Sequence, residues 1–157
     1  MCYDSQARPP LPPGSGGHAQ GRDVTLTADD GNSFAAYLAT PDHPGGPRVL
    51  IMPDVRGLHE FYKELARRFA EQGIAALAMD YFGRTAGLTP RDDSFEFMPH
   101  VTQIQFDTFQ TDVAAALVRL RMMDGDENAP FTLGFCMGGM FSLLTGTRDH
   151  QLSGVVN

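Results

Sequence analysis

The chain has few cysteines, little positive charge and no long apolar segment. Its two cysteines, Cys2 and Cys136, do not form the framework of a disulfide-rich domain. The net charge of −7 argues against binding to a nucleic-acid backbone, because proteins that do so carry an excess of Lys and Arg. No apolar run approaches the roughly 18 residues that cross a bilayer, and the N-terminus has no apolar signal-peptide core. We therefore expect a cytoplasmic protein in which Cys136 stays reduced.

The remaining sequence alternates apolar runs with amphipathic segments, and its 157 residues suit one domain. Asp30-Gly31 predicts a hairpin turn, because both residues tolerate the backbone of a tight turn. Strands are expected at 23–28, 33–38, 48–52, 74–79, 131–133 and 152–156, and helices at 59–72, 106–123 and 137–148. This order predicts an α/β fold, in which an antiparallel hairpin precedes a mostly parallel sheet with flanking helices.

Two segments lack these patterns. Residues 1–22 are rich in Pro, Gly and Ser, so we expect an irregular lead-in there and a domain that occupies 23–157. Residues 80–104 form a long connection with Gly, Pro and charged residues, which is the kind of loop that often carries function.

The hexapeptide at 134–139, Gly-Phe-Cys-Met-Gly-Gly, lies between a predicted strand and a predicted helix. A nucleophile elbow has this context, because its sharp turn exposes one reactive side chain above the sheet. Glycines suit such a turn, which is strained and crowded. The apex residue, Cys136, would lie at a helix N-terminus, whose partial positive charge favours the thiolate. The pattern predicts a nucleophilic cysteine; a buried structural cysteine in a glycine-rich corner is the alternative.

In a mostly parallel sheet, the functional site lies at the carboxyl ends of the strands. Three reactive or charged side chains follow strand ends in this sequence, namely Asp54, Arg84 and Cys136. Because the topology directs these strand ends to one edge of the sheet, we expect the three residues to belong to one site.

Three motifs together resemble the dienelactone hydrolase family of α/β-hydrolases, which has a cysteine nucleophile. They are Ile-Met-Pro-Asp-Val-Arg-Gly at 51–57, Met-Asp-Tyr-Phe-Gly-Arg at 79–84 and the elbow at 134–139. The resemblance extends over roughly residues 20–157. It implies hydrolysis of an enol-lactone or related carboxylic ester through an acyl-cysteine intermediate, without a metal or an organic cofactor.

The resemblance also implies roles for individual residues. Cys136 matches the nucleophile, and the backbone amides of Met137 and Val55 match the two donors of the oxyanion hole. Arg84 matches an arginine that binds the substrate carboxylate, a task that suits a bidentate guanidinium. The implied partner is therefore a small, anionic ester or lactone, and we expect no nucleic-acid or membrane partner.

Two positions depart from the family pattern. Asp54 stands where the best-known family member has Glu in contact with the cysteine, and its side chain is one methylene shorter. We expect Asp54 to help activate the thiol from this position. Arg56 replaces an apolar residue and adds a second cation that could bind an anionic substrate.

The family's catalytic Asp and His have no match in this sequence. The residues after the elbow hold one acid and one histidine, Asp149 and His150, and neighbours on a helix face in different directions. Residues 153–157 are typical of the beginning of a strand. We therefore expect a C-terminally incomplete fold, and impaired catalysis by the 157-residue chain itself.

Two other functions remain open at this point. A glutamine amidotransferase also uses a cysteine elbow, but it would carry Gly-His-Gln after the turn where this chain has Gly139-Met140-Phe141. A non-catalytic remnant is the second alternative, in which the strand at 152–156 presents unpaired backbone groups to another chain. The sequence leaves the substrate and the oligomeric state undetermined.

Overall fold

The computed structural model describes residues 4, 6–13, 16–43, 45–123 and 129–157, so Cys2 and part of the predicted lead-in lie outside the described residues. The strands are β1 (Ala19–Thr27), β2 (Ser33–Pro41), β3 (Arg48–Met52), β4 (Ala75–Met79), β5 (Phe131–Gly134) and β6 (Gly154–Val156). The helices are α1 (Glu60–Glu71), α2 (Gly83–Ala86), α3 (Met98–Val101), α4 (Phe106–Arg121) and α5 (Met137–Thr145).

The strands form a six-stranded sheet in the order β1-β2-β4-β3-β5-β6. β1 pairs with β2, and β2 with β4, in antiparallel orientation, whereas β4, β3, β5 and β6 run parallel. Every residue of β3 and β4 is buried, as expected of central strands that are covered on both faces. The predicted α/β fold with a mostly parallel sheet and an N-terminal antiparallel hairpin is confirmed.

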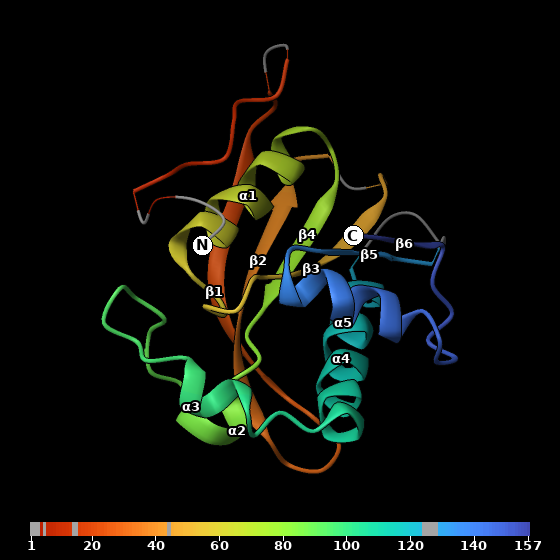
Figure 1. Ribbon diagram of the computed structural model, residues 1–157. Coiled ribbons are helices and arrows are strands. Elements are labelled where there is room, and N and C mark those ends of the chain that lie inside the picture. The colour runs from red at the N-terminus through yellow and green to blue at the C-terminus, as the bar shows by residue number, and fades with distance from the viewer. Residues whose placement is uncertain (1–3, 5, 14–15, 44, 124–128) are drawn as a thin grey trace.

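Helices cover the two faces of the sheet (Figure 1). α1 packs on one face, where it buries Tyr62, Ala66 and Ala70 against alternate residues of β2, β3 and β4. α4 and α5 cover the other face. The residues that these two helices bury there are Phe109, Val113, Ala116, Leu117, Leu120 and Phe141. Because successive side chains of a strand point to opposite faces, the same short strands supply both cores.

The first strand is longer than the sequence pattern predicts. β1 was expected at 23–28 but begins at Ala19, so the last four residues of the predicted 1–22 lead-in belong to the sheet. Backbone pairing explains the difference, since Ala19 to Arg22 pair with Pro41 to Leu38 of β2 although most of their side chains are exposed. A strand at the edge of a sheet can be held by backbone hydrogen bonds alone, so its side chains need not alternate between apolar and polar.

The connection at 80–104 is more ordered than a plain loop, because it contains the single-turn helices α2 and α3. A buried ion pair anchors it. Arg91 Nη2 lies 2.9 Å from Asp80 Oδ2, and their side chains are 2% and 0% exposed. Asp80 also accepts hydrogen bonds from the amides of Leu58 (3.1 Å) and Phe82 (3.0 Å). One carboxylate therefore joins the end of β4, the loop after β3 and the connection that follows.

Candidate active site

Cys136 lies at the turn between β5 and α5 with φ 55° and ψ −116°, and its side chain is exposed. Few non-glycine residues adopt a positive φ, and such strain is often found at functional sites. The backbone approaches so closely on both sides of Cys136 that only glycine fits at positions 134 and 138. A Cβ at Gly134 would lie 2.0 Å from the carbonyl oxygen of Gly138, and one at Gly138 would lie 2.1 Å from that of Pro53. The structure therefore has the geometry of a nucleophile elbow.

The elbow packs directly against the end of β3. The Phe135 amide donates a hydrogen bond to the Met52 carbonyl over 3.1 Å, which continues the β3–β5 pairing into the turn. Among bonds between described residues, the amides of Met137 and Val55 donate none. An oxyanion hole needs N–H groups that are free to donate, and the assignment of these two amides to it remains a prediction.

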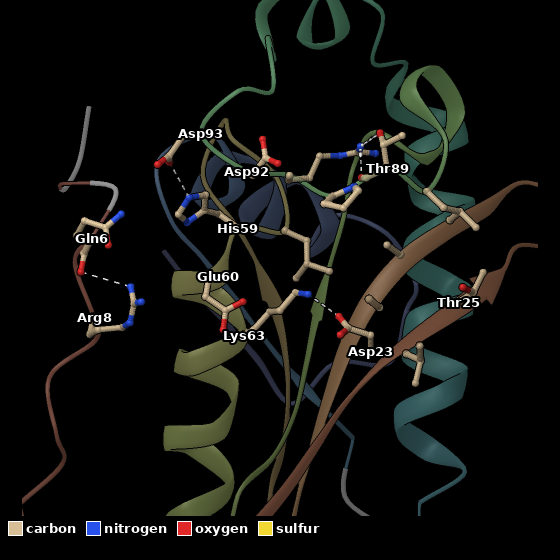
Figure 2. Close-up of a pocket in the computed structure, with 17 residues that line it drawn as sticks. Gln6, Arg8, Asp23, Thr25, His59, Glu60, Lys63, Thr89, Asp92 and Asp93 are labelled. Atoms are coloured by element: carbon tan, nitrogen blue, oxygen red, sulfur yellow. Dashed lines mark hydrogen bonds and ion pairs between the residues drawn. The ribbon is translucent and has the colours of Figure 1, made fainter.

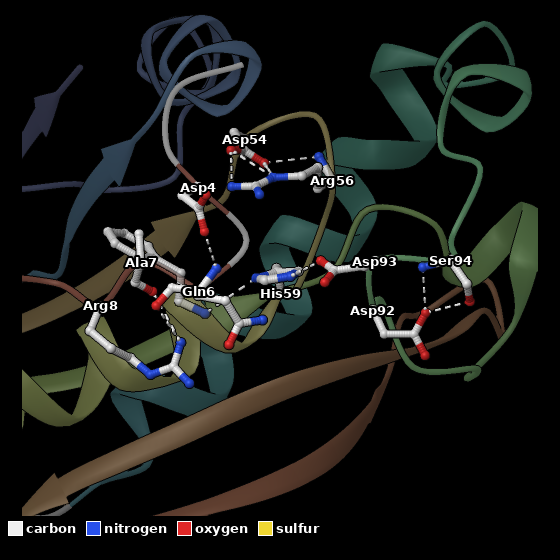
Figure 3. A network of polar contacts seen from close by, with 11 residues as sticks. Asp4, Gln6, Ala7, Arg8, Asp54, Arg56, His59, Asp92, Asp93 and Ser94 are labelled. Carbon is white, nitrogen blue, oxygen red and sulfur yellow. Dashed lines mark hydrogen bonds and ion pairs between the residues drawn. The ribbon is translucent and has the colours of Figure 1, made fainter.

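Asp54 and Arg56 form an ion pair in the turn that follows β3 (Figure 3). The carboxylate of Asp54 accepts from the Arg56 amide at 2.9 Å and from Arg56 Nη2 at 2.9 Å. The Asp54 side chain is 3% exposed and that of Arg56 is 15% exposed. Both carboxylate oxygens are therefore engaged by a cation, and among the described contacts none joins Asp54 to Cys136 directly. The proposed role of Asp54 in activating the thiol remains a prediction.

Tyr81 lies beside the elbow and the loop after β3, and the sequence pattern did not predict this position. Its hydroxyl donates a hydrogen bond to the Pro53 carbonyl, and its ring packs edge-on against Phe82, Phe109 and Phe141. The side chain is 4% exposed. Tyr81 follows Asp80 in the motif at 79–84, but the sequence pattern alone does not show which face of the sheet edge it occupies.

Burial raises the pKa of the Tyr81 hydroxyl well above its usual value, and the charges of Asp80, Asp54 and Cys136 raise it further. Tyr81 therefore stays protonated and can donate its hydrogen bond at any ordinary pH. The elbow also lies against the residue that precedes Asp54, because a Cβ at Gly138 would be 2.1 Å from the Pro53 carbonyl oxygen. Cys136 and Asp54 therefore lie in turns that pack against each other, and their shared role remains a prediction.

Arg84 is engaged by contacts within the chain. Its Nη1 lies 2.7 Å from Asp30 Oδ2, and its Nη2 lies 2.7 Å from Asp112 Oδ1 and 3.0 Å from the Thr108 carbonyl. Burial alone would lower the pKa of Arg84, but the hydrogen bonds with Asp30 and Asp112 outweigh it and raise the pKa. Arg84 thus links the hairpin turn to α4 as a charged group. To bind a substrate carboxylate, it would have to exchange one of these partners.

A cavity of about 560 Å³ lies between the start of α1, the hairpin strands and residues 88–93 (Figure 2). His59, Lys63 and Asp93 are among its lining residues, and Cys136 is not among the described residues that line it. His59 caps α1 through the Phe61 amide and contacts Asp93 at 3.2 Å. This cavity is therefore separate from the elbow.

Two other kinds of feature are absent from the described part of the chain. No group of three or more His, Cys, Asp or Glu side chains is arranged to hold a metal ion. No helix in the same residues is long and apolar enough to cross a membrane.

Comparison with known proteins agrees with this geometry. The model of the dienelactone hydrolase family matches residues 34–157. Among curated relatives, carboxymethylenebutenolidase from Rhodococcus opacus is 28% identical over 162 residues, which cover 92% of this chain and 54% of the relative. Carboxymethylenebutenolidase from Pseudomonas putida is 24% identical over 132 residues, which cover 81% of this chain and 56% of the relative.

Solved structures give the same assignment of fold. A dienelactone hydrolase-like promiscuous phosphotriesterase from metagenomic libraries is 27% identical with a TM-score of 0.67, covering 82% of this chain and 54% of the other. A protein from Klebsiella pneumoniae, provisionally named a dienelactone hydrolase, has a TM-score of 0.73 at 23% identity, covering 86% of this chain and 57% of the other. The chain thus spans about half the length of the curated relatives it matches. The matched region includes the elbow, β3 to β6 and all of β2 except its first residue, so this chain belongs to the dienelactone hydrolase family.

Proposed function

We propose that this chain supplies the nucleophile and the oxyanion site of an ester or lactone hydrolase. The observation that carries the proposal is the strained, exposed Cys136 at the N-terminus of α5, packed against the end of β3. Membership in a family whose relatives are named carboxymethylenebutenolidase supports a small carboxylic ester or lactone as the substrate. A cytoplasmic, reducing location belongs to the same proposal, because the reaction needs a free thiol.

The chemistry begins with attack by the Cys136 thiolate on the substrate carbonyl carbon. The developing oxyanion would be stabilised by the amides of Met137 and Val55. When the Sγ–C bond has formed, the ester C–O bond breaks, and the leaving alkoxide takes up a proton from solvent water. The product of this half-reaction is an acyl-cysteine thioester, which water must then cleave to release the acid and restore the thiol.

Cleavage of the thioester needs a base that activates water. In the described residues, none of the hydrogen bonds joins a histidine to Cys136. Because this chain matches only about half the length of its relatives, we propose that the base and its acidic partner lie outside the 157 residues. On this proposal, the chain alone forms the acyl-enzyme but releases the acid slowly.

The acylation step is tested by incubating the purified chain with 4-nitrophenyl acetate and measuring the intact mass. We expect an acyl adduct on Cys136 that persists, and a decrease of roughly 10³-fold or more in its rate of formation for Cys136→Ser, since a serine hydroxyl is a poor nucleophile without a base. Rapid turnover without an adduct would show that a working base is present in the chain. Absence of any reaction in the unchanged chain would contradict the proposed function.

An anionic substrate is proposed because Arg56 and Arg84 both lie near the carboxyl edge of the sheet, after β3 and β4 respectively.

The variant Arg84→Ala tests whether Arg84 binds the substrate or only stabilises the fold. It leaves Asp112, with a side chain 3% exposed, without its arginine, so we expect a loss of about 1–3 kcal/mol in the free energy of unfolding. This loss is measured by urea denaturation.

If Arg84 also binds the substrate, the same variant will be acylated more slowly by an anionic ester than by a neutral ester of equal size. Arg67→Ala is the matched control, because Arg67 also binds a buried side chain, the Tyr37 hydroxyl, but does so on the α1 face. Equal slowing with both esters would restrict Arg84 to the structural role.

A further inference from the structure

The Tyr81 hydroxyl contacts both segments that carry the proposed oxyanion donors. On one side it donates to the Pro53 carbonyl. On the other side it lies against the first turn of α5, where a Cβ added to Gly138 would be only 2.5 Å from the hydroxyl oxygen. The same added Cβ would lie 2.1 Å from the Pro53 carbonyl oxygen. The hydroxyl, the loop after β3 and the elbow therefore meet at one point.

This contact affects the orientation of the Val55 amide. The Pro53 carbonyl belongs to the peptide plane directly before the plane that carries the Val55 N–H. The carbonyl of that second plane, on Asp54, accepts a 3.0 Å hydrogen bond from the Gly57 amide. Since peptide units are planar, fixing both carbonyls fixes the direction of the Val55 N–H.

We propose that Tyr81 is a positioning residue for acylation, which holds the Val55 amide at a set distance and direction from the Met137 amide. The inference rests on the proposed function, and it adds a residue that acts through the backbone after β3 rather than on the substrate. Because an oxyanion hole acts through donors that are already in place, a small rotation of one donor lowers its contribution. A displacement of about 1 Å at a reacting centre can cost roughly 10²-fold in rate.

The hydroxyl, rather than the ring, is the functional part of Tyr81 on this proposal. The ring packs among Phe82, Phe109 and Phe141, and a phenylalanine ring would make the same contacts. Burial keeps the hydroxyl protonated, so that it remains a donor to the Pro53 carbonyl. Removing the hydroxyl therefore leaves the packing intact and releases the loop after β3.

The test compares Tyr81→Phe with the unchanged chain in two reactions of Cys136. Acylation by 4-nitrophenyl acetate uses the oxyanion site, whereas alkylation by iodoacetamide needs only an accessible thiolate. We expect Tyr81→Phe to slow acylation by roughly 10–100-fold and to leave alkylation within about twofold. Tyr37→Phe is the matched control, because Tyr37 is also buried and its hydroxyl binds Arg67 on the opposite face of the sheet. We expect this control to leave both rates unchanged.

Each outcome decides between the proposals. Equal acylation of the unchanged chain and Tyr81→Phe would overturn the positioning role and leave the proposed function standing. No acylation of the unchanged chain would overturn both. If Tyr81→Phe does not melt cooperatively, Tyr81→Leu is measured in its place. Loss of folding in both variants would also overturn the inference, because the hydroxyl would then be needed for the fold itself.

Discussion

Gly138→Ala is expected to remove the acylation activity and to destabilise the chain, although it adds a single methyl group. The added Cβ would lie 2.1 Å from the Pro53 carbonyl oxygen and 2.2 Å from that of Met52. Both atoms belong to backbone at the end of a buried central strand, so neither can move easily. We expect the elbow to shift instead, with a loss of about 1–3 kcal/mol in stability and more than roughly 10² in the acylation rate.

Gly139→Ala is the matched control for this prediction. A Cβ at Gly139 would make ordinary contacts, with Asn157 Cβ at 3.4 Å and the Gly134 carbonyl oxygen at 3.5 Å. Because alanine favours a helix over glycine by about 0.5–1 kcal/mol, this variant should be as stable as the unchanged chain or slightly more stable. Urea denaturation and the acylation assay measure both variants. Similar losses in the two would show that α5 tolerates no substitution, and the close approach at Gly138 would not be the cause.

Asp80→Ala is expected to lower the free energy of unfolding by about 3–5 kcal/mol, because it leaves the guanidinium of Arg91 buried without its carboxylate. The amides of Leu58 and Phe82 lose their acceptor as well. For a chain of this size, the melting temperature should fall by roughly 6–20 °C. Thermal unfolding followed by circular dichroism measures the change.

Two further variants show whether the buried charge is the cause. Asp92→Ala removes an exposed carboxylate from the same connection, one that binds Ser94, and should change the stability little. The double variant Asp80→Ala with Arg91→Met removes both charges, so it should cost less than the sum of the two single changes. Additive losses would indicate that the two residues stabilise the chain independently, and the ion pair would not explain the effect.

Features that depend on local spacing could be predicted from the sequence alone. Alternating apolar runs and amphipathic segments predicted the mostly parallel sheet, because burial on both faces requires apolar strands. The glycines at 134 and 138 predicted the elbow around Cys136, since only residues without a Cβ allow the backbone to approach so closely. The family resemblance was also carried by short contiguous motifs, and the match over 34–157 confirms it.

Which charged and polar side chains meet depends on the tertiary structure. Arg84 and Asp112 are 28 residues apart, and only the packing of α4 beside the hairpin turn brings them together with Asp30. Tyr81 reaches the Pro53 carbonyl across a similar separation of 28 residues, through a buried position that no periodic pattern marks. The start of β1 at Ala19 depends in the same way on pairing with β2. These contacts join residues distant in the chain, and their energies depend on burial and geometry that exist only after the sheet has formed.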